Sequence, residues 1–332
     1  MREDITANVR GCTACQKIKS RNHGPYGMTD SKVPHQPGFS VSCDILGPLP
    51  TAQGQYEYIL VLTDDFTKNF ELYPLRVATA KAAAKCLVEN CCRHGFMKNL
   101  RSDNGRQFAS MIWNETCKML GIKARKTSPY RPAGNPTKRL NRTIKQCLKA
   151  YCSSHRDWAK YLPTIAFALR TAVNETTGQT PAMLTYGREL DSPFAPATNT
   201  AEGNTSNYCE YTTKLQAKMK EIFEQTRAAI SRNRKTYEKG YNKRRIASPF
   251  KVGDLVLRQT NRLSRANYAV TSSLIPQFEG PHKLARQFGR NVFSLENLDG
   301  KDAGSRNVDQ LKLFVAPPQG PAQALPAAKG TH

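Results

Sequence analysis

The sequence predicts an α/β protein in which a mixed sheet with helices on its faces is followed by a helical linker and a small β-barrel. Three observations support this fold class. Strand-length and helix-length segments follow one another in the order βββαβαβα between residues 39 and 151. A linker composition and then a long helical segment occupy residues 191–248, and short strands separated by Gly and Asn turns fill residues 249–315. The chain of 332 residues is long enough for two or three domains.

The first half of the predicted sheet is an antiparallel meander. The segment "GFSVSCDILGPLP" contains a β-rich run that ends in Asp44 and breaks at Gly47 and Pro48. Two apolar strands follow, residues 58–62 and 70–75, and the polar turn "TDDFTKN" joins them. Three consecutive strands with short connections therefore open the domain.

Helices and shorter strands complete the predicted domain. The Ala-rich residues 79–94 have the composition of a helix. A strand-length segment then leads directly into Asp103, and Asn104-Gly105 forces a turn. Residues 108–120 are predicted as one helix, and "IKARKT" adds another strand. Further on, residues 158–170 look helical, and "GQTPAMLTYGREL" reads as a turn before a short apolar run.

The segment "NPTKRLNRTIKQCLKAY" has two stripes at helical spacing. The apolar stripe would face the core and consists of Leu140, Ile144, Cys147, Leu148 and Tyr151. The basic stripe consists of Lys138, Arg142, Lys145 and Lys149. Residues 116–156 include eleven Lys and Arg but no Asp or Glu, so this face lacks the usual partners at i,i+4. A phosphate-binding surface is favoured over a merely solvated one.

A long helix over residues 209–237 is predicted to run into a second basic cluster. This cluster consists of Arg232, Arg234, Lys235, Lys239, Lys243, Arg244 and Arg245. In the whole chain 50 Lys and Arg stand against 26 Asp and Glu, a formal charge of +24. Such a surplus favours a polyanionic partner, because each neutralised phosphate releases condensed counterions. The predicted partner is a nucleic acid.

Neither membrane insertion nor secretion is indicated. No run of eighteen apolar residues occurs, and "MREDITANVRG" lacks the apolar stretch of a signal peptide. Most of the ten cysteines lie in apolar or helical patterns, as reduced core cysteines do. The expected location is intracellular. Cys12 and Cys15, in "CTAC", have ligand spacing, but the following His23 and His35 do not complete a recognisable zinc motif.

Asp44 and Asp103 suggest one chemical function. Each follows or ends a strand, and carboxylates brought side by side at strand ends can hold divalent metal ions. Such ions activate a hydroxyl group and stabilise the leaving oxygen in phosphoryl transfer. Taken alone, either aspartate would more often be a turn or capping residue.

The surrounding motifs occur in the order seen in integrases of gypsy-type LTR retrotransposons, relatives of retroviral integrase. They are "CDILGPLP", "YILVLTDDFTKNFELYPL", "RSDNGRQF", "TSPYRPAGNPTKRLNRTIK", "TGQTPAMLTYGREL" and "FKVGDLVLR". The resemblance extends from about residue 1 to residue 314 and implies an RNase H-like catalytic core over residues 35–190, with an SH3-like barrel over residues 249–315. It also implies an N-terminal zinc module of two His and two Cys, which would survive here only as a truncated remnant over residues 1–30.

The resemblance further implies a reaction and its partners. Mg²⁺ or Mn²⁺ on an Asp-Asp-Glu triad would trim the 3′ ends of element DNA and join them to target DNA in the nucleus, within a homo-oligomer. Asp44 and Asp103 match the two Asp positions. Lys138 stands at the Glu position, and the His pair of the zinc module is missing before Cys12 and Cys15, so a zinc ion is not expected.

Lys138 also conflicts with its place in the predicted helix. With Asn135 as N-cap and Pro136 at the first helical position, residue 138 falls at N3, where Glu would complete a capping box. An ammonium group suits neither this position nor the helix dipole. The sequence therefore predicts a DNA-binding protein of the integrase family with impaired catalysis. Two alternatives remain: an active integrase that uses an altered triad or partner subunits, and a relic reading frame. The tail, residues 316–332, is predicted to be disordered.

Overall fold

The computed structural model describes residues 2–29, 33–127, 137–152, 154–191, 208–260 and 274–317. The chain divides into two compact units. One consists of residues 30–240, and the other combines residues 1–29 with residues 241–332. The predicted tail after residue 317 lies outside the described residues, as do Asn135 and Pro136.

The unit of residues 30–240 is built on a five-stranded mixed sheet of order β3-β2-β1-β4-β5. Its strands are β1 (Ser40–Leu46), β2 (Tyr58–Asp64), β3 (Phe70–Leu75), β4 (Asn99–Ser102) and β5 (Lys123–Lys126). The first three strands pair antiparallel, as the meander predicts, whereas β4 pairs parallel to β1 and β5 parallel to β4. The parallel pairing of β1 and β4 brings their carboxyl ends to the same edge of the sheet.

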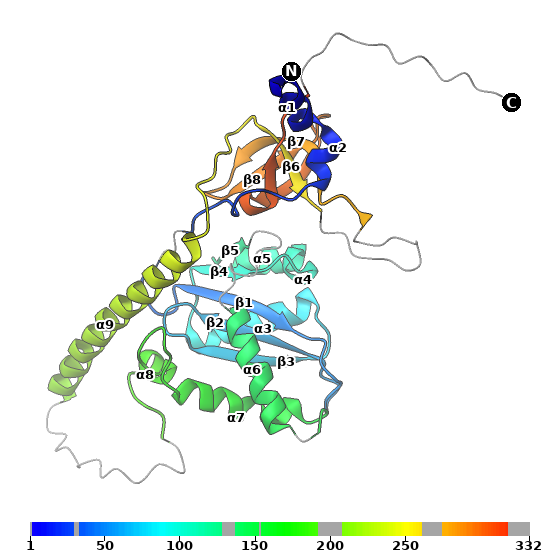
Figure 1. The fold of residues 1–332 in the computed structure, drawn as a ribbon. Helices are drawn as coiled ribbons and strands as arrows, with labels where there is room; N and C mark the ends of the chain where they lie inside the picture. The colour runs from blue at the N-terminus through cyan, green and yellow to red at the C-terminus, as the bar shows by residue number, and fades with distance from the viewer. Residues whose placement is uncertain are drawn as a thin grey trace. The chain divides into compact units, whose positions relative to one another are not determined.

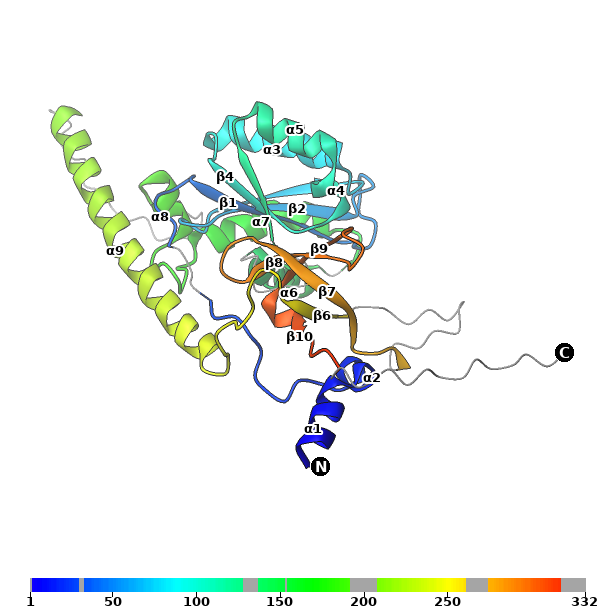
Figure 2. The ribbon, with the colours of Figure 1, turned by 90° about the horizontal axis from the view of Figure 1, so that it is seen from above.

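Helices cover both faces of this sheet (Figures 1 and 2). On one face, α3 (Ala80–His94) and α5 (Met111–Met119) enclose a core that includes Leu60, Leu87 and Trp113. On the other, α6 (Thr137–Tyr151) and α7 (Trp158–Thr171) pack over a core that includes Ile59 and Ile144. This arrangement of a mixed sheet between two helical layers is the RNase H-like fold that the sequence predicts.

Three predicted elements differ from the structure. The strand expected to end in Asp44 continues to Leu46. The single helix expected over residues 108–120 is two helices, α4 (Arg106–Ala109) and α5, because Ser110 has extended backbone angles between them. The short apolar run near residue 181 is a helix, α8 (Pro181–Tyr186). The Thr180 side chain caps it by accepting a hydrogen bond from the Met183 amide, and its first residue is a proline, which suits that position.

The long helix α9 (Tyr208–Asn242) packs against the loop between β2 and β3. Phe66 in this loop is fully buried, and its ring meets that of Phe223 edge to face with centroids 5.7 Å apart. Thr226 and Ile230, further along α9, are also fully buried. The segment "TDDFTKN", predicted as a polar turn, therefore also anchors a helix.

The second unit contains a five-stranded antiparallel sheet of order β10-β6-β7-β8-β9, compatible with a small barrel-like domain. Its strands are β6 (Leu255–Gln259), β7 (Phe278–Gln287), β8 (Val292–Glu296), β9 (Asp302–Asn307) and β10 (Leu311–Leu313). The core includes Val256, Leu284 and Phe293, all essentially buried. A short 3₁₀ helix, Val308–Gln310, precedes β10.

The N-terminal segment folds onto this sheet. It contains α1 (Arg2–Gly11) and α2 (Thr13–Ile18). The Gln16 side chain donates to the Val315 carbonyl at 2.8 Å and accepts from the Val315 amide at 3.0 Å. Gly27 has φ = +90°, and a Cβ there would lie 2.5 Å from Val308 Cγ2. The first 29 residues thus complete the unit that the C-terminal strands begin.

Candidate active site: an acid pair with Lys138 nearby

Asp44 lies in β1 on the face that α6 covers. Side chains alternate along a strand, so Asp44 shares its face with Leu46, which belongs to the core beneath α6 and α7. Its cross-strand partner is Val61, a member of the same core. Only 7% of Asp44 is exposed. A carboxylate is therefore held in a largely apolar layer between the sheet and a helix.

Asp103 directly follows β4 and is partly exposed. Its Oδ1 accepts a hydrogen bond of 2.9 Å from the Gly105 amide, which fixes the turn at Asn104 and Gly105. Because β4 runs parallel to β1 and Ser42 pairs with Arg101, Asp103 falls level with Asp44, toward the carboxyl ends of both strands. The negative charge of Asp103 repels that of Asp44 and so raises the pKa of Asp44.

The pKa of Asp44 is raised from 3.8 to about 6. Burial is the main cause, because a desolvated carboxylate resists ionisation, and repulsion from Asp103 adds to it. Three contributions oppose the rise: the charge of Lys138, a hydrogen bond from the Ile45 amide and one from Asn141. Asp44 and Asp103, which we call the acid pair, therefore concentrate negative charge that is only partly compensated.

Lys138 is the second residue of α6, and its side chain is exposed. Its charge acts on Asp44. Among the described residues, no ion pair within 4 Å joins the Lys138 ammonium to Asp44 or Asp103. Lys138 thus interacts with Asp44 through its charge rather than through a direct salt bridge.

Asn141 is the partner of Asp44 that the sequence did not reveal. Its Nδ2 donates a 2.8 Å hydrogen bond to Asp44 Oδ2, and Asn141 is 7% exposed. Its Oδ1 is buried without a hydrogen-bond partner. One signal was available: Asn141 follows Lys138 by three positions, so both lie on the same side of the predicted helix.

The donor set fits a pair of catalytic metal ions poorly. Asp44 and Asp103 offer carboxylate oxygens, the ligands that Mg²⁺ and Mn²⁺ prefer. The third position of the implied triad holds an ammonium group, which supplies positive charge where a ligand should supply negative charge. In the described ranges, no group of three or more His, Cys, Asp or Glu side chains is placed to hold a metal ion.

Cys12 and Cys15 lie at the start of α2. Both are partly exposed thiols. The pKa of Cys12 is lowered, first by a hydrogen bond from the Cys15 backbone and then by one from the Cys15 side chain. Neither cysteine is near the acid pair in sequence or belongs to the same compact unit.

The residues predicted to bind DNA fall into two groups. Exposed side chains include Arg142, Lys145 and Lys149 on α6, and Arg232, Lys235, Lys243 and Arg244 near the end of α9. The other two basic residues have partners within their own units. Arg234 is about half-buried, and its pKa is lowered mainly by burial, against the charge of Asp65. Arg245 donates to the Tyr26 carbonyl at 2.9 Å and lies 4.1 Å from the centre of the Tyr241 ring.

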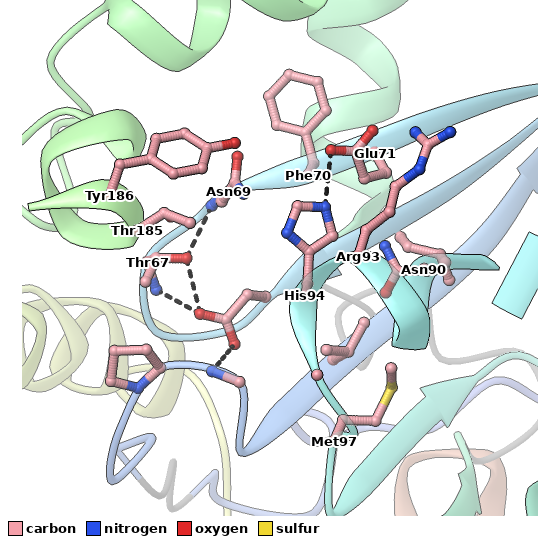
Figure 3. A pocket seen from close by; sticks show the side chains of 16 residues that line it. Thr67, Asn69, Phe70, Glu71, Asn90, Arg93, His94, Met97, Thr185 and Tyr186 are labelled. Carbon is pink, nitrogen blue, oxygen red and sulfur yellow. Dashed lines mark hydrogen bonds and ion pairs between the residues drawn. The ribbon is translucent and has the colours of Figure 1, made fainter. Parts of the chain in front are cut away.

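A separate cavity of about 370 Å³ lies at the other end of the sheet (Figure 3). Met97, which lines it, precedes β4, whereas Asp103 follows β4. Figure 3 shows His94 against Glu71, a contact of 3.1 Å, and Arg170 reaches the same Glu71 oxygen at 2.8 Å. Burial alone would raise the pKa of Glu71, but His94 and Arg170 outweigh it and lower that pKa. These contacts link β3, α3 and α7, so they hold the sheet to its two helical layers.

No helix in the described part of the chain has both the length and the apolar character needed to cross a membrane.

Residues 34–132 match the family model of the integrase core domain, and residues 250–314 match a domain of unknown function, DUF8803. The Tf2-3 and Tf2-4 transposon polyproteins of Schizosaccharomyces pombe are 27% identical over 308 residues, which is 90% of this chain. The chain spans 22% of the length of these relatives.

One chain in the cryo-EM structure of the simian T-cell lymphotropic virus intasome in complex with PP2A regulatory subunit B56 gamma has the same fold. It aligns with 93% of this chain and 89% of its own chain, at a TM-score of 0.56 and 16% identity. The domain match lies over the mixed sheet that carries Asp44 and Asp103. Residues 34–132 are therefore similar to the integrase core domain, and the chain shares its fold with a chain of a retroviral intasome.

Proposed function

We propose that this chain is a DNA-binding protein of the gypsy-type retrotransposon integrase family whose capacity for DNA strand transfer is impaired. The observation that carries the proposal is the position of Lys138, whose charge acts on Asp44 beside Asp103. The similarity to Tf2 polyproteins and the integrase core match support the family assignment. The net charge of +24 supports DNA as the partner.

The impairment follows from the charges at the site. In two-metal catalysis the ions hold both the attacking and the leaving oxygens, and carboxylates must hold the ions. Asp44 and Asp103 would be the residues that hold Mg²⁺ or Mn²⁺. A bound divalent ion would supply Lewis-acid activation of a phosphodiester. Lys138 opposes its binding because it adds positive charge where a glutamate would add negative charge.

DNA binding needs no metal ion in this proposal. Lys145 and Lys149 are exposed on α6, whereas the preceding Ile144 and Leu148 are buried, so the lysines present charge to solvent rather than to the core. We expect the chain to bind element ends and target DNA, as a homo-oligomer in the nucleus. The intasome with the same fold supports an assembly on DNA, and the Tf2 relatives support an element origin.

One observation favours the alternative, an active integrase with an altered triad or with partner subunits that supply an intact one. Asp44 within β1 lies level with Asp103 directly after β4, and Asp44 keeps a hydrogen-bond donor in Asn141. A site that served only to bind DNA would gain nothing from two neighbouring carboxylates whose charge is only partly compensated.

The test separates binding from chemistry. The natural chain is titrated into a fluorescent duplex in EDTA, and strand transfer is assayed separately with Mn²⁺ and a pre-trimmed element end. We expect salt-dependent binding in EDTA and little or no strand transfer. Metal-dependent strand transfer by the natural chain would support the alternative, and failure to bind DNA at low salt would overturn the proposal itself.

A further inference from the structure

The outer strands of the mixed sheet carry a basic surface that the sequence motifs did not single out. It consists of Arg101 on β4 and Lys123 and Arg125 on β5, and we call it the β4–β5 basic face. All four residues of β5 are exposed, and the side chain of Arg101 is 37% exposed. The three side chains lie on one face because Leu100 and Ile122, which alternate with them, belong to the core on the opposite face.

The same face leads to the acid pair. Ser42 on β1 pairs with Arg101 on β4, and Arg101 pairs with Arg125 on β5. These three residues therefore form a row across the adjacent strands β1, β4 and β5. Asp44 and Asp103 lie two positions further along β1 and β4, on the same side of the sheet. The helix α6 packs over β1 and β2 instead. The acid pair therefore lies between the basic stripe of α6 and the β4–β5 basic face.

Like charges dominate this face. Arg101 and Arg125 are directly paired across adjacent strands, an arrangement that destabilises a sheet unless a counter-charge is present. The structure gives Arg101 one carboxylate, Asp65, at 3.5 Å. In the ranges that the structure describes, no salt bridge joins Lys123 or Arg125 to a carboxylate.

Asp65 already interacts with several other groups. It is 3% exposed and accepts hydrogen bonds from Ser40 Oγ at 2.7 Å and Ser42 Oγ at 2.8 Å. The charges of Lys68 and Arg234 also act on it. Asp65 thus acts on three cations, and Asp64 adds a second carboxylate charge at Lys68, so Arg101 is compensated only in part. Neither aspartate forms a salt bridge with Lys123 or Arg125 in the described ranges.

We infer that the β4–β5 basic face is a second phosphate-contact surface, and that the backbone of one DNA segment crosses the acid pair from α6 to β5. This inference rests on the DNA binding proposed above. A phosphodiester chain is the anion that fits, because the cations follow one another along the sheet rather than converging on a point. Arginine is also suited to contact phosphate oxygens with two donors at once.

The test compares paired neutralisations of equal charge in the full chain. Lys123→Gln/Arg125→Gln alters the β4–β5 basic face, and Lys145→Gln/Lys149→Gln alters α6. Lys81→Gln/Lys85→Gln is the matched control, because both lysines are exposed on α3, over the other face of the sheet. Binding of a fluorescent 30-base-pair duplex is measured by anisotropy at several KCl concentrations.

We expect each of the first two variants to reduce the magnitude of the negative slope of log K against log salt by about 2, since each phosphate contact contributes about 0.9. The control should leave the slope unchanged, and combining the first two variants should give additive losses. A normal slope in Lys123→Gln/Arg125→Gln, with a reduced slope in the α6 variant, would overturn the inference and leave the proposed function standing. Absence of DNA binding by the natural chain would instead overturn both.

A second measurement needs no variant. Acetylation of lysines in the natural chain is followed by mass spectrometry with and without the duplex. Protection of Lys123 with no protection of Lys81 supports the surface, and equal modification of Lys123 in both samples contradicts it.

Discussion

The Nδ2 atom of Asn141 on α6 donates a 2.8 Å hydrogen bond to Oδ2 of Asp44 on β1. This bond joins a helix to the strand beneath it at the acid pair. It also stabilises the ionised form of a carboxylate whose pKa is about 6 because of burial and the nearby Asp103. Asn141 thus helps to set the charge of the site.

Removing this donor should raise the pKa of Asp44 further. In Asn141→Ala the carboxylate loses a hydrogen bond that favours its charged form, so we expect a pKa above about 6. The pKa is read from the pH dependence of the Asp44 carboxyl carbon resonance by NMR. Asn114→Ala, an exposed change on α5, is the control. An unchanged pKa in Asn141→Ala would contradict the role given to this bond.

Neutralising Asp44 should stabilise the fold at neutral pH. The folded-state pKa is raised above the ordinary 3.8, so ionisation costs stability as the pH rises from about 4 through about 6. Asp44→Asn keeps an acceptor for Asn141 and removes this cost. We expect a gain of at most about 3 kcal/mol in the free energy of unfolding at pH 8, since one pKa unit is about 1.4 kcal/mol.

The gain should nearly disappear at about pH 3, where Asp44 is mostly protonated in both the folded and the unfolded state. Urea unfolding at the two pH values measures the difference. Destabilisation by Asp44→Asn at pH 8 would show that the carboxylate is favourably compensated after all.

The ring contact between Phe66 and Phe223 should hold α9 to the sheet. Truncating a fully buried phenylalanine costs about 3–5 kcal/mol. Phe66→Ala should therefore destabilise the unit and speed amide hydrogen exchange in α9 around Phe223. Phe96→Ala, at a site 60% exposed, should do neither. Exchange in α9 that stays as slow as in the natural chain would contradict the anchoring role of Phe66.

Reversing the charge of α6 should weaken DNA binding without regard to base sequence. Lys145→Glu/Lys149→Glu removes two exposed cations and adds two anions beside the phosphates, so affinity and salt dependence should both fall. Anisotropy on two duplexes of different sequence measures the effect. Lys81→Glu/Lys85→Glu is the control for net charge. Equal losses in the two variants would point to a general charge effect rather than to a contact surface.

The strands and helices of the core could be predicted because local patterns dominate there. The predicted strand over residues 70–75 coincides with β3, and the helix expected over residues 79–94 differs from α3 by one residue at its start. The break at Ser110 was missed although the residue itself is a signal: Ser110 is the N-cap of α5, and serine is a preferred N-cap residue.

Contacts between distant segments could not be predicted in the same way. The segment "TDDFTKN" has the composition of an exposed turn, yet two of its residues are buried. Asp65 is buried because Arg101 offsets its charge, and Phe66 is buried because its ring packs against Phe223 of α9. The docking of Gln16 on Val315 depends on the fold of a distant sheet. At the acid pair, motif order pointed to Asp44, Asp103 and Lys138, whereas Asn141 emerged only from the packing of α6.

The central claim is that Lys138 occupies the position where a carboxylate would complete the metal site. The decisive measurement compares the natural chain with Lys138→Glu and Lys138→Gln, by calorimetric titration of Mn²⁺ and by strand transfer on a pre-trimmed element end. Lys138→Gln removes the positive charge without adding a ligand and so separates repulsion from coordination. We predict weak Mn²⁺ binding and little strand transfer in the natural chain, a modest gain in Mn²⁺ affinity in Lys138→Gln, and both tight binding and measurable strand transfer in Lys138→Glu. Tight Mn²⁺ binding with strong strand transfer in the natural chain, lost in Lys138→Glu, would contradict the account.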